Sequence, residues 1–214
     1  MLQEACVAIG LELSGWQTAA LIRFNELLQR WNAVYSLTSV RDLDAALAVH
    51  VIDCLAAVPS LRRHLRDVDS PALVDVGSGG GLPGVVFAIT NPAIRLVCVD
   101  AVRKKTAFVT QVAAELQLEN LMSVHGRVEA LVGSFDLITS RAFSSLTDFV
   151  RLTAHLRRPT GLWMAMKGKE PSQEIAELPS SFSVFHVEHI EVPGLVGDRC
   201  LAWIRPSSQS PESP

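Results

Sequence analysis

The sequence contains little that would hold a protein together covalently or through a metal. It has four cysteines, at positions 6, 54, 98 and 200, with no Cys-x-x-Cys pair and no histidine at zinc-finger spacing. This spacing argues against a disulfide framework and gives no reason to expect a structural metal. With 214 residues the chain is long enough to bury a stable core without either. We therefore expect a domain stabilised by packing, with no metal site.

An excess of basic charge, a secretory signal and a long apolar run are also missing. The formal net charge is −3, and the longest apolar runs are interrupted by Pro83, Pro92 or charged residues. Residues 1–4 lack the basic start of a signal peptide. Hydrophobic residues make up 49% of the chain and charged residues 19%, which excludes a disordered chain. These features predict a soluble, cytoplasmic protein with no membrane partner, and they leave open one basic face on an acidic body.

The N-terminal part of the chain has helical periodicity. A capping-box pattern at Ser14 and Gln17 opens a stripe of apolar residues at helical spacing. A second amphipathic segment follows Asp42, and we expect Pro59 to end it. The sequence therefore predicts an N-terminal helical extension over residues 1–58.

Beyond residue 72 short apolar strands alternate with helical segments, which predicts a parallel sheet covered on both faces. The last two strands are separated by too few residues for a helical crossover, so we expect them to pair antiparallel. The strands are expected at residues 72–76, 94–99, 121–124, 135–139, 162–166, 182–192 and 200–204. This pattern predicts an α/β domain over residues 59–205, followed by a disordered tail at 206–214 that is rich in Ser and Pro.

The most informative motif is the glycine-rich segment at residues 73–84, Leu-Val-Asp-Val-Gly-Ser-Gly-Gly-Gly-Leu-Pro-Gly. Glycine permits positive φ and lets a ligand approach the main chain, and the following helix offers unpaired N–H groups. Ligands of open α/β sheets bind at the carboxyl ends of the strands. We therefore predict a nucleotide-cofactor turn that contains Asp75, Gly77, Gly79 and Gly81.

The second strand is expected to end near Asp100, roughly 20 residues after the glycine loop. A carboxylate at this place can accept both hydroxyls of a ribose, which suits an adenosine-containing ligand. The alternative is a cap for the helix that begins near Val102, and the two roles can coexist.

Two cofactors fit this loop. The dinucleotide-binding fingerprint is Gly-x-Gly-x-x-Gly. Counted from the end of the strand, it needs its third glycine at position 82, where this chain has Leu82. Counted from Gly79, the pattern is satisfied by Gly79, Gly81 and Gly84. An NAD-type oxidoreductase therefore stays open. The Gly-x-Gly-x-Gly spacing favours S-adenosylmethionine, and so does the antiparallel end of the sheet. We therefore predict a class I S-adenosylmethionine-dependent methyltransferase fold, Rossmann-like, with a seven-stranded, mostly parallel sheet and one antiparallel strand.

The ends of the third and fourth strands supply further candidates. The backbone N–H of Val128 and the carboxylate of Glu129 could meet an adenine edge, although a solvated Glu in a first helical turn is the alternative. Arg141 places a guanidinium beside the cofactor cleft, where it could pair with a carboxylate or with RNA phosphate, or simply lie at the surface.

A basic run at Arg103, Lys104 and Lys105 lies close to the second strand end. Taken alone it is more often a solvated surface run than a nucleic-acid contact. In an RNA-modifying enzyme these three residues, together with the N-terminal helices, are candidate RNA contacts.

Different methyl-accepting atoms require different sequence motifs in a methyltransferase. Cytosine C5 methylation needs a cysteine, usually beside proline, and none of the four cysteines follows a proline. Methylation of an exocyclic amine usually employs an Asn/Asp-Pro-Pro-aromatic turn, where this chain has Ser140-Arg141-Ala142-Phe143. Guanine N7 carries a lone pair and no proton, so its methylation needs no general base. No catalytic residue is then expected, and the histidines are better explained as structural or exposed.

Several segments occur in a characteristic order: Leu37-Thr38-Ser39-Val40-Arg41-Asp42, His50 with Asp53, the loop at 75–84, Arg127-Val128-Glu129, Ser140-Arg141-Ala142-Phe143 and Lys167-Gly168. Together they resemble the bacterial small-subunit ribosomal RNA guanine-N7 methyltransferases, the RsmG family, also called glucose-inhibited division protein B. The resemblance extends from the N-terminal helices to about residue 205. Two positions depart from the family pattern, since Ser36 and Gly80 stand where the family commonly has Asn and Pro.

The resemblance implies S-adenosylmethionine as methyl donor and guanine 527, in the decoding-region loop of 16S ribosomal RNA, as acceptor. The RNA could be naked or part of an assembling small ribosomal subunit. Carried over by position, the donor contacts would be Gly77, Leu82, Val128, Glu129 and Arg141. A non-catalytic RNA-binding module that kept the same fold stays open as an alternative.

Overall fold

A seven-stranded sheet forms the centre of the computed structural model, which describes residues 1–38, 40, 42–141, 143 and 145–207. The strand order is β3-β2-β1-β4-β5-β7-β6. Neighbours from β3 to β5 pair parallel, whereas β7 is antiparallel to both β5 and β6. The strands are β1 (Ala72–Val76), β2 (Arg95–Asp100), β3 (Leu121–His125), β4 (Phe135–Ser140), β5 (Arg157–Lys167), β6 (Phe182–His189) and β7 (Cys200–Pro206). The predicted α/β fold with one reversed strand is confirmed.

Two strand boundaries differ from the sequence prediction by three residues or more. Strand β5 begins at Arg157, five residues before the predicted start, and its early part consists of two partly exposed arginines followed by the exposed Pro159 and Thr160, which hide the strand pattern. Strand β6 ends at His189 instead of residue 192. Beyond it, the N–H of Ile190 still donates to the carbonyl of Arg199, and the chain then turns through Gly194 at a φ of 84°. The ladder therefore stops where the connection to β7 needs a turn.

The N-terminal helices follow the predicted start signals. The helices here are α1 (Leu2–Ala8), α2 (Gly15–Tyr35), α3 (Leu43–Ala46), the π-helical η1 (Leu47–Ile52), α4 (Asp53–Leu55) and α5 (Val58–Leu65). The capping box is confirmed, because Gln17 N donates to Ser14 Oγ and Ser14 N donates to Gln17 Oε1. The expected helix end at Pro59 is wrong. Pro59 lies in the first turn of α5, where proline's missing N–H costs nothing, so the helical path continues.

The helical path from Leu43 to Leu65 is longer and more apolar than the sequence pattern suggested. Its most apolar window has a mean hydropathy of 1.5, so by length and composition it could cross a membrane. However, 61% of that window is buried inside the structure. Residues such as Val51 and Leu55 are fully buried in the core shared with the sheet. This stretch therefore packs as a core helix of the domain.

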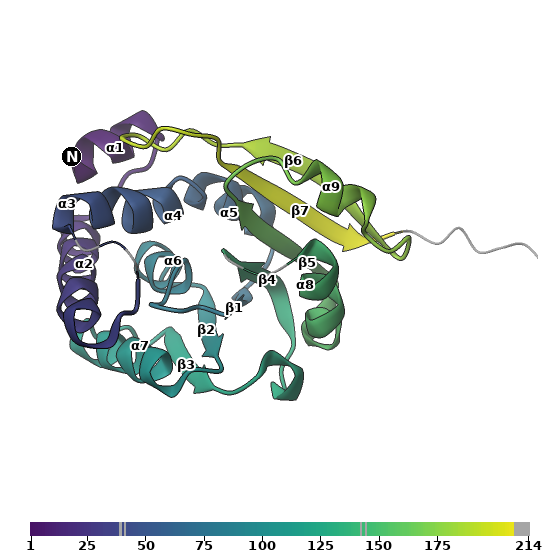
Figure 1. The fold of residues 1–214 in the computed structure, drawn as a ribbon, viewed down its shortest axis with the longest axis horizontal. Coiled ribbons are helices and arrows are strands. Elements are labelled where there is room, and N and C mark those ends of the chain that lie inside the picture. The colour runs from purple at the N-terminus through teal and green to yellow at the C-terminus, as the bar shows by residue number, and fades with distance from the viewer. Residues whose placement is uncertain (39, 41, 142, 144, 208–214) are drawn as a thin grey trace, which may run out of the picture.

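Helices cover both faces of the sheet (Figure 1). The N-terminal helices pack on one face together with α6 (Gly84–Thr90) and α7 (Arg103–Glu115), around buried aromatic residues such as Phe87 and Phe108. The other face is covered by α8 (Leu146–Thr153), with α9 (Ser172–Ala176) beside it. Short 3-10 turns, η2 (Val128–Ala130) and η3 (Ala154–Leu156), complete the chain. The carboxyl ends of β1 to β5 consequently lie at one edge, beside the N-terminal helices.

Some predictions concern residues that the structure does not describe. Ser39, Arg41 and Ala142 of the family motifs lie outside the described residues, and so do residues 208–214 of the expected tail. Strand β7 itself ends at Pro206.

Candidate functional site

The glycine loop after β1 is held by its own backbone and by the next strand. Gly77, Gly79 and Gly81 have φ angles of 66°, 57° and 80°, the left-handed region that glycine adopts without strain. The N–H groups of Gly77 and Ser78 both donate to the carbonyl of Val99, at 2.9 and 3.2 Å. A Cβ on Gly81 would lie 2.4 Å from Val85 Cγ2, inside contact distance. The loop is therefore closely packed and needs glycine for its shape.

Asp100, at the end of β2, connects this loop to α7. Its Oδ2 accepts from Gly79 N at 3.0 Å, and its Oδ1 accepts from Val102 N at 2.8 Å. The side chain is largely buried. A carboxylate offers about four acceptor positions, and the two backbone N–H groups occupy two of them. The capping role predicted as the alternative is present, and it leaves capacity for ribose hydroxyls.

Four of the predicted donor-site residues line one cavity of about 190 Å³: Gly77, Asp100, Val128 and Glu129. They come from the ends of β1, β2 and β3, as expected for ligand sites of open α/β sheets. The sequence interpretation missed Phe143 and Leu152, which add apolar surface to the same cavity. Phe143 sits in a motif noted after β4, whereas Leu152 gives no sequence signal beyond its place on α8.

Asp75, also predicted in this site, lies beneath the loop. It is fully buried, and its Oδ2 accepts from Gly84 N at 2.8 Å at the start of α6. Burial raises the pKa of Asp75 to about 7, against the opposing effect of this hydrogen bond. Its Oδ1 has no hydrogen-bond partner among the described residues. Leu82 is likewise buried in the core. The geometry gives Asp75 a supporting position under the loop, since it does not line the donor cavity.

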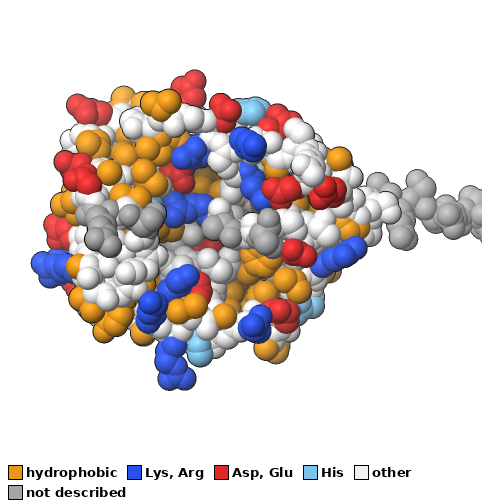
Figure 2. All heavy atoms as spheres, viewed as in Figure 1, with side chains coloured by type: hydrophobic (Ala, Val, Ile, Leu, Met, Phe, Trp, Pro, Cys, Tyr) orange, Lys and Arg blue, Asp and Glu red, His pale blue; other side chains and the backbone are white. Residues whose placement is uncertain are grey.

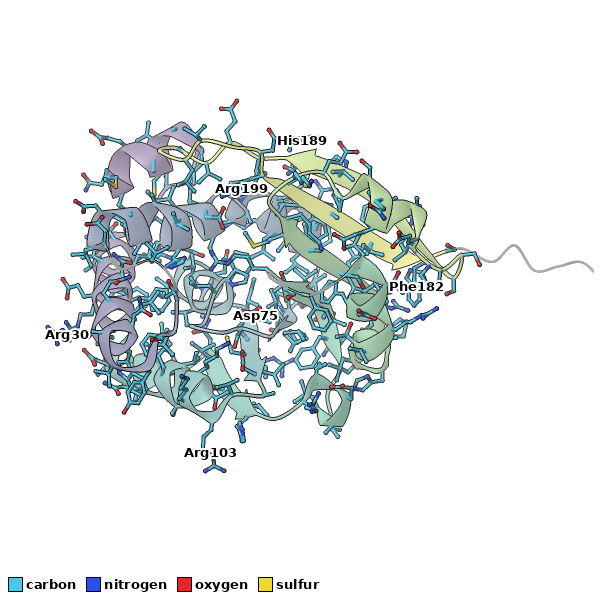
Figure 3. All side chains as sticks on the ribbon, in the orientation of Figure 1. Arg30, Asp75, Arg103, Phe182, His189 and Arg199 are labelled. Carbon is cyan, nitrogen blue, oxygen red and sulfur yellow. The ribbon has the colours of Figure 1, made fainter. Side chains whose placement is uncertain are left out.

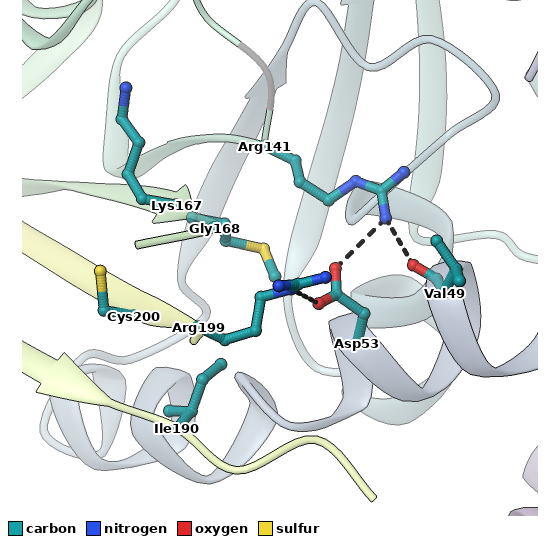
Figure 4. A pocket seen from close by; sticks show the side chains of 9 residues that line it. Val49, Asp53, Arg141, Lys167, Gly168, Ile190, Arg199 and Cys200 are labelled. Carbon is teal, nitrogen blue, oxygen red and sulfur yellow. Dashed lines mark hydrogen bonds and ion pairs between the residues drawn. The ribbon is translucent and has the colours of Figure 1, made fainter. Parts of the chain in front are cut away.

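Arg141 lies in a second cavity of about 250 Å³, away from the residues grouped around Asp100. Its Nη1 donates to the carbonyl of Val49 at 3.1 Å and to Asp53 Oδ2 at 3.3 Å. Arg199, from the β6–β7 connection, donates through Nε to Asp53 Oδ1 at 2.9 Å. Figure 4 shows the two guanidinium groups converging on this carboxylate, while Lys167 extends away from it. Of the carboxylate and phosphate partners proposed for Arg141, the structure shows the carboxylate.

Lys167 also lines the second cavity and carries a paired charge. Its Nζ lies 2.8 and 2.9 Å from the two carboxylate oxygens of Glu174 on α9. Glu174 additionally accepts from the N–H of Leu146 at the start of α8. This lysine is therefore held at the cavity rim by the elements that cover the far face of the sheet.

His50 is a buried neighbour of Arg141. Its Nδ1 lies 3.4 Å from Arg141 Nη2, and its Nε2 lies 2.9 Å from Thr38 Oγ1. Burial and the Arg141 guanidinium lower the pKa of His50 to about 4, so the ring is neutral near pH 7. A guanidinium only donates, so Nδ1 accepts from it and Nε2 carries the proton toward Thr38. Both ring nitrogens of His50 are therefore engaged by neighbouring side chains.

The three basic residues at the start of α7 have different surroundings. Lys104 Nζ donates to the carbonyl of Tyr35 at 2.8 Å, and Lys105 Nζ lies 3.8 Å from Asp100 Oδ2. Arg103 is exposed and extends into solvent from the edge of the molecule (Figure 3). Figure 2 shows Lys and Arg side chains over the middle and the lower edge of the face that is turned toward the viewer.

Within the described residues, no group of three or more His, Cys, Asp or Glu could hold a metal.

Sequence comparisons match nearly the whole chain. The model of the family described as rRNA small subunit methyltransferase G matches residues 17–202. The "Ribosomal RNA small subunit methyltransferase G" of Acidovorax sp. (strain JS42) is 53% identical over 212 residues, covering 96% of this chain and 94% of the relative. The protein of the same name from Polaromonas sp. (strain JS666 / ATCC BAA-500) is 48% identical over 207 residues, covering 95% and 92%.

Solved structures agree on the fold. TrmN from Thermus thermophilus superposes with a TM-score of 0.56 at 17% identity, covering 71% of this chain and 48% of that one. The ribosomal protein L11 methylase from Lactobacillus delbrueckii subsp. bulgaricus gives a TM-score of 0.52 at 16% identity, covering 72% and 76%. The class I methyltransferase fold expected from the sequence is thereby confirmed.

Proposed function

Because the chain belongs to the rRNA small subunit methyltransferase G family, we propose that it transfers a methyl group from S-adenosylmethionine to N7 of a guanine in 16S ribosomal RNA. The family membership makes it an S-adenosylmethionine-dependent methyltransferase. We also propose which guanine it modifies, which residues hold donor and acceptor, and where the enzyme acts. The guanine implied by the family resemblance is position 527 in the decoding-region loop.

The main support for the proposed donor site is the buried carboxylate of Asp100. It lies at the wall of the cavity with Gly77, Val128 and Glu129, and its oxygens keep acceptor positions beyond the two backbone N–H groups that they bind. These residues fit the adenosine of S-adenosylmethionine: Asp100 would accept from the ribose hydroxyls, and Val128 and Glu129 would face the adenine edge. When bound, S-adenosylmethionine supplies an electrophilic methyl group.

The acceptor would lie at the second cavity, at the ends of β4 and β5. Arg141, Arg199 and Lys167 line it, and the first two are fixed by Asp53. Cationic side chains at this place favour a ligand that carries phosphates. A guanine N7 has no proton to lose, so the chain has only to hold the base in line with the methyl group. The neutral, doubly engaged His50 fits a reaction without a general base.

We take residues 1–58 as a helical extension of a methyltransferase domain at 59–205. The substrate is ribosomal RNA, either free or within an assembling small subunit, and the enzyme would then act in the cytoplasm. Sucrose-gradient fractions of naked RNA, small subunits and whole ribosomes, each offered separately to the enzyme, would identify the preferred substrate.

The direct test uses purified protein, labelled S-adenosylmethionine and unmethylated 16S RNA. We expect label in the RNA, and nuclease digestion should release 7-methylguanosine. Label in another methylated nucleoside, in protein or in small molecules would contradict the proposal.

The two alternatives from other functional classes make different predictions for the same cavity. An NAD-type oxidoreductase should bind NAD in calorimetry, whereas the proposal expects S-adenosylhomocysteine to bind and NAD not to bind. A non-catalytic RNA-binding module would bind RNA and leave it unlabelled.

A further inference from the structure

Four aromatic rings form a row from the core of the protein to its surface. Phe24 of α2 and Phe108 of α7 are fully buried, with ring centroids 6.3 Å apart. Trp31 packs on Phe108 at 5.4 Å, and Tyr35 packs on Trp31 at 4.9 Å. The row ends at Tyr35, which is 43% exposed. The outermost ring is thus supported by packing from below and open to solvent above.

The residue that carries this ring is also fixed through its backbone. Tyr35 is the last residue of α2, and its carbonyl accepts from Lys104 Nζ at 2.8 Å. A lysine on the final carbonyl of a helix satisfies a group that the helix leaves unpaired and interacts favourably with the helix dipole. Tyr35 is therefore held against α7, so its ring loses little conformational freedom when a ligand packs on it.

Tyr35 lies beside the start of α7, the helix that follows Asp100. Lys104 belongs to the first turn of α7, and the N–H of Val102, just before that helix, donates to Asp100 Oδ1. Asp100 lines the donor cavity. Arg103, between Val102 and Lys104, is exposed at the same helix start. An exposed aromatic ring and two cationic side chains therefore lie together where the end of α2 meets the start of α7, a few residues along the chain from Asp100.

We propose that Tyr35 is a stacking platform for an unpaired base of the RNA substrate, with Arg103 and Lys104 contacting the phosphates of that strand. Aromatic rings bind unpaired bases by stacking, and flanking Lys and Arg residues follow the charged backbone. The positive charge of the two side chains matches the phosphate backbone of RNA. This inference rests on the proposed function, because it assigns to the methyltransferase a contact outside the target guanine.

The single tyrosine of the sequence makes the platform directly observable. Incorporation of 3-fluorotyrosine gives one fluorine resonance, which reports on the ring face of Tyr35. We expect this resonance to shift when a 16S RNA fragment is added, and to stay in place when S-adenosylhomocysteine alone is added. A resonance that is unmoved at saturating RNA would overturn the platform.

Binding measurements on variants provide the second test. Tyr35→Ala should weaken binding of the RNA fragment roughly 5- to 100-fold, the range for loss of one stacked base. Tyr35→Phe keeps the ring and should bind within about twofold of the wild type. Val34→Ala, at an exposed neighbouring position, is the matched control and should also bind normally. Arg103→Ala should lower the salt dependence of binding by about one phosphate contact.

The possible outcomes separate this inference from the proposed function. Equal RNA affinities for Tyr35→Ala and wild type, in an enzyme that methylates RNA normally, would overturn the platform and leave the function intact. A wild type that neither binds nor methylates RNA would overturn both. Melting temperature and S-adenosylhomocysteine affinity should be unchanged in Tyr35→Phe and Val34→Ala. If Tyr35→Ala unfolds the protein, the fluorine resonance decides the question.

Discussion

Arg199 donates through Nε to Asp53 Oδ1 at 2.9 Å, although the two residues are 146 positions apart in the chain. The other oxygen of Asp53 accepts from Arg141 at the end of β4. One largely buried carboxylate thus connects the N-terminal helices, the centre of the sheet and the β6–β7 connection. In the proposed function, this connection sets the shape of the acceptor cavity.

Replacing Asp53 should therefore affect both stability and activity. Asp53→Asn leaves two guanidinium groups without their counter-charge, and since both are partly exposed we expect a loss of about 1–3 kcal/mol in the free energy of unfolding. RNA methylation should also fall, because Arg141 and Arg199 lose their orientation. Urea denaturation and turnover on 16S RNA measure the two effects. Asp67→Asn, which removes a pair exposed to solvent, should change neither; a similar loss in both variants would contradict this role.

Asp100 should determine donor affinity. Asp100→Asn removes the charge that would bind the ribose hydroxyls, and hydrogen bonds to charged groups contribute about 1.5–3 kcal/mol. We expect S-adenosylhomocysteine to bind roughly 10- to 100-fold more weakly in calorimetry. Asp136→Asn is the matched control, since this buried carboxylate pairs with Arg158 and lies outside the donor cavity. It should lower stability and leave donor affinity unchanged. Normal donor affinity in Asp100→Asn would refute the assigned role.

Asp75 should make stability depend on pH. Its carboxyl has a pKa of about 7 in the folded state and near 3.8 when unfolded, so the folded state binds the proton more tightly. The stability contributed by the protonated group is complete below about pH 4 and is lost as the pH rises through 7. Asp75→Asn can still accept from Gly84 N and does not titrate. Its free energy of unfolding, relative to wild type, should rise by a few kcal/mol between pH 4 and pH 8.

The pH dependence of His50 has the opposite sign and does not disturb this comparison. Its folded-state pKa of about 4 lies below the ordinary 6.5, so its contribution is complete above pH 6.5 and is lost as the pH falls toward 4. His50 is present in wild type and variant alike, so its effect cancels in the difference. Asp69→Asn, at an exposed carboxylate, serves as control. A difference between Asp75→Asn and wild type that does not change with pH would show that Asp75 is ionised throughout.

Ser36 offers a stabilising substitution. It ends α2 with a φ of 50°, a left-handed conformation that asparagine tolerates better than serine. Ser36→Asn should raise the free energy of unfolding by about 0.5 kcal/mol. Ser70→Asn, at a φ of 46°, should do the same, whereas Ser181→Asn, outside the positive-φ positions, should not. Melting temperatures of the three variants would show whether the backbone conformation is the cause.

Local patterns in the sequence predicted the sheet and the donor loop because their causes are local. Alternating apolar segments gave the strands, and glycine spacing gave the loop. The loop's need for glycine at position 81 comes from the distant Val109 as well as from the nearby Val85, and a sequence pattern does not express such a contact. From the sequence we predicted Asp75 in the donor site, whereas its side chain lies beneath the loop. The alternation of a strand predicts on which face of the sheet a side chain lies. It does not predict whether that side chain reaches a cavity at the end of the strand.

The spacing of residues in the sequence could not predict that Arg141 and Arg199 both bind the Asp53 carboxylate. It depends on how the N-terminal helices pack against the sheet and on the path of the β6–β7 connection, both of which arise from tertiary packing. His50 and Asp53 were recognisable as a family motif, but their partners were not. Arg199 gave no signal in the sequence, and Lys167 was noted only as part of a motif. Of the cationic residues at the proposed acceptor cavity, Arg141 was predicted from the sequence, whereas Arg199 had to come from the structure.

A nucleotide-resolution map of 7-methylguanosine in 16S RNA tests the central claim most directly. The map would compare a strain that lacks this protein with the same strain carrying either the wild-type chain or Asp100→Asn. We predict that one guanine, at position 527 of the decoding-region loop, lacks the N7 methyl group without the protein, regains it with the wild type, and regains little of it with Asp100→Asn. A 16S map that is identical with and without the protein would contradict the account.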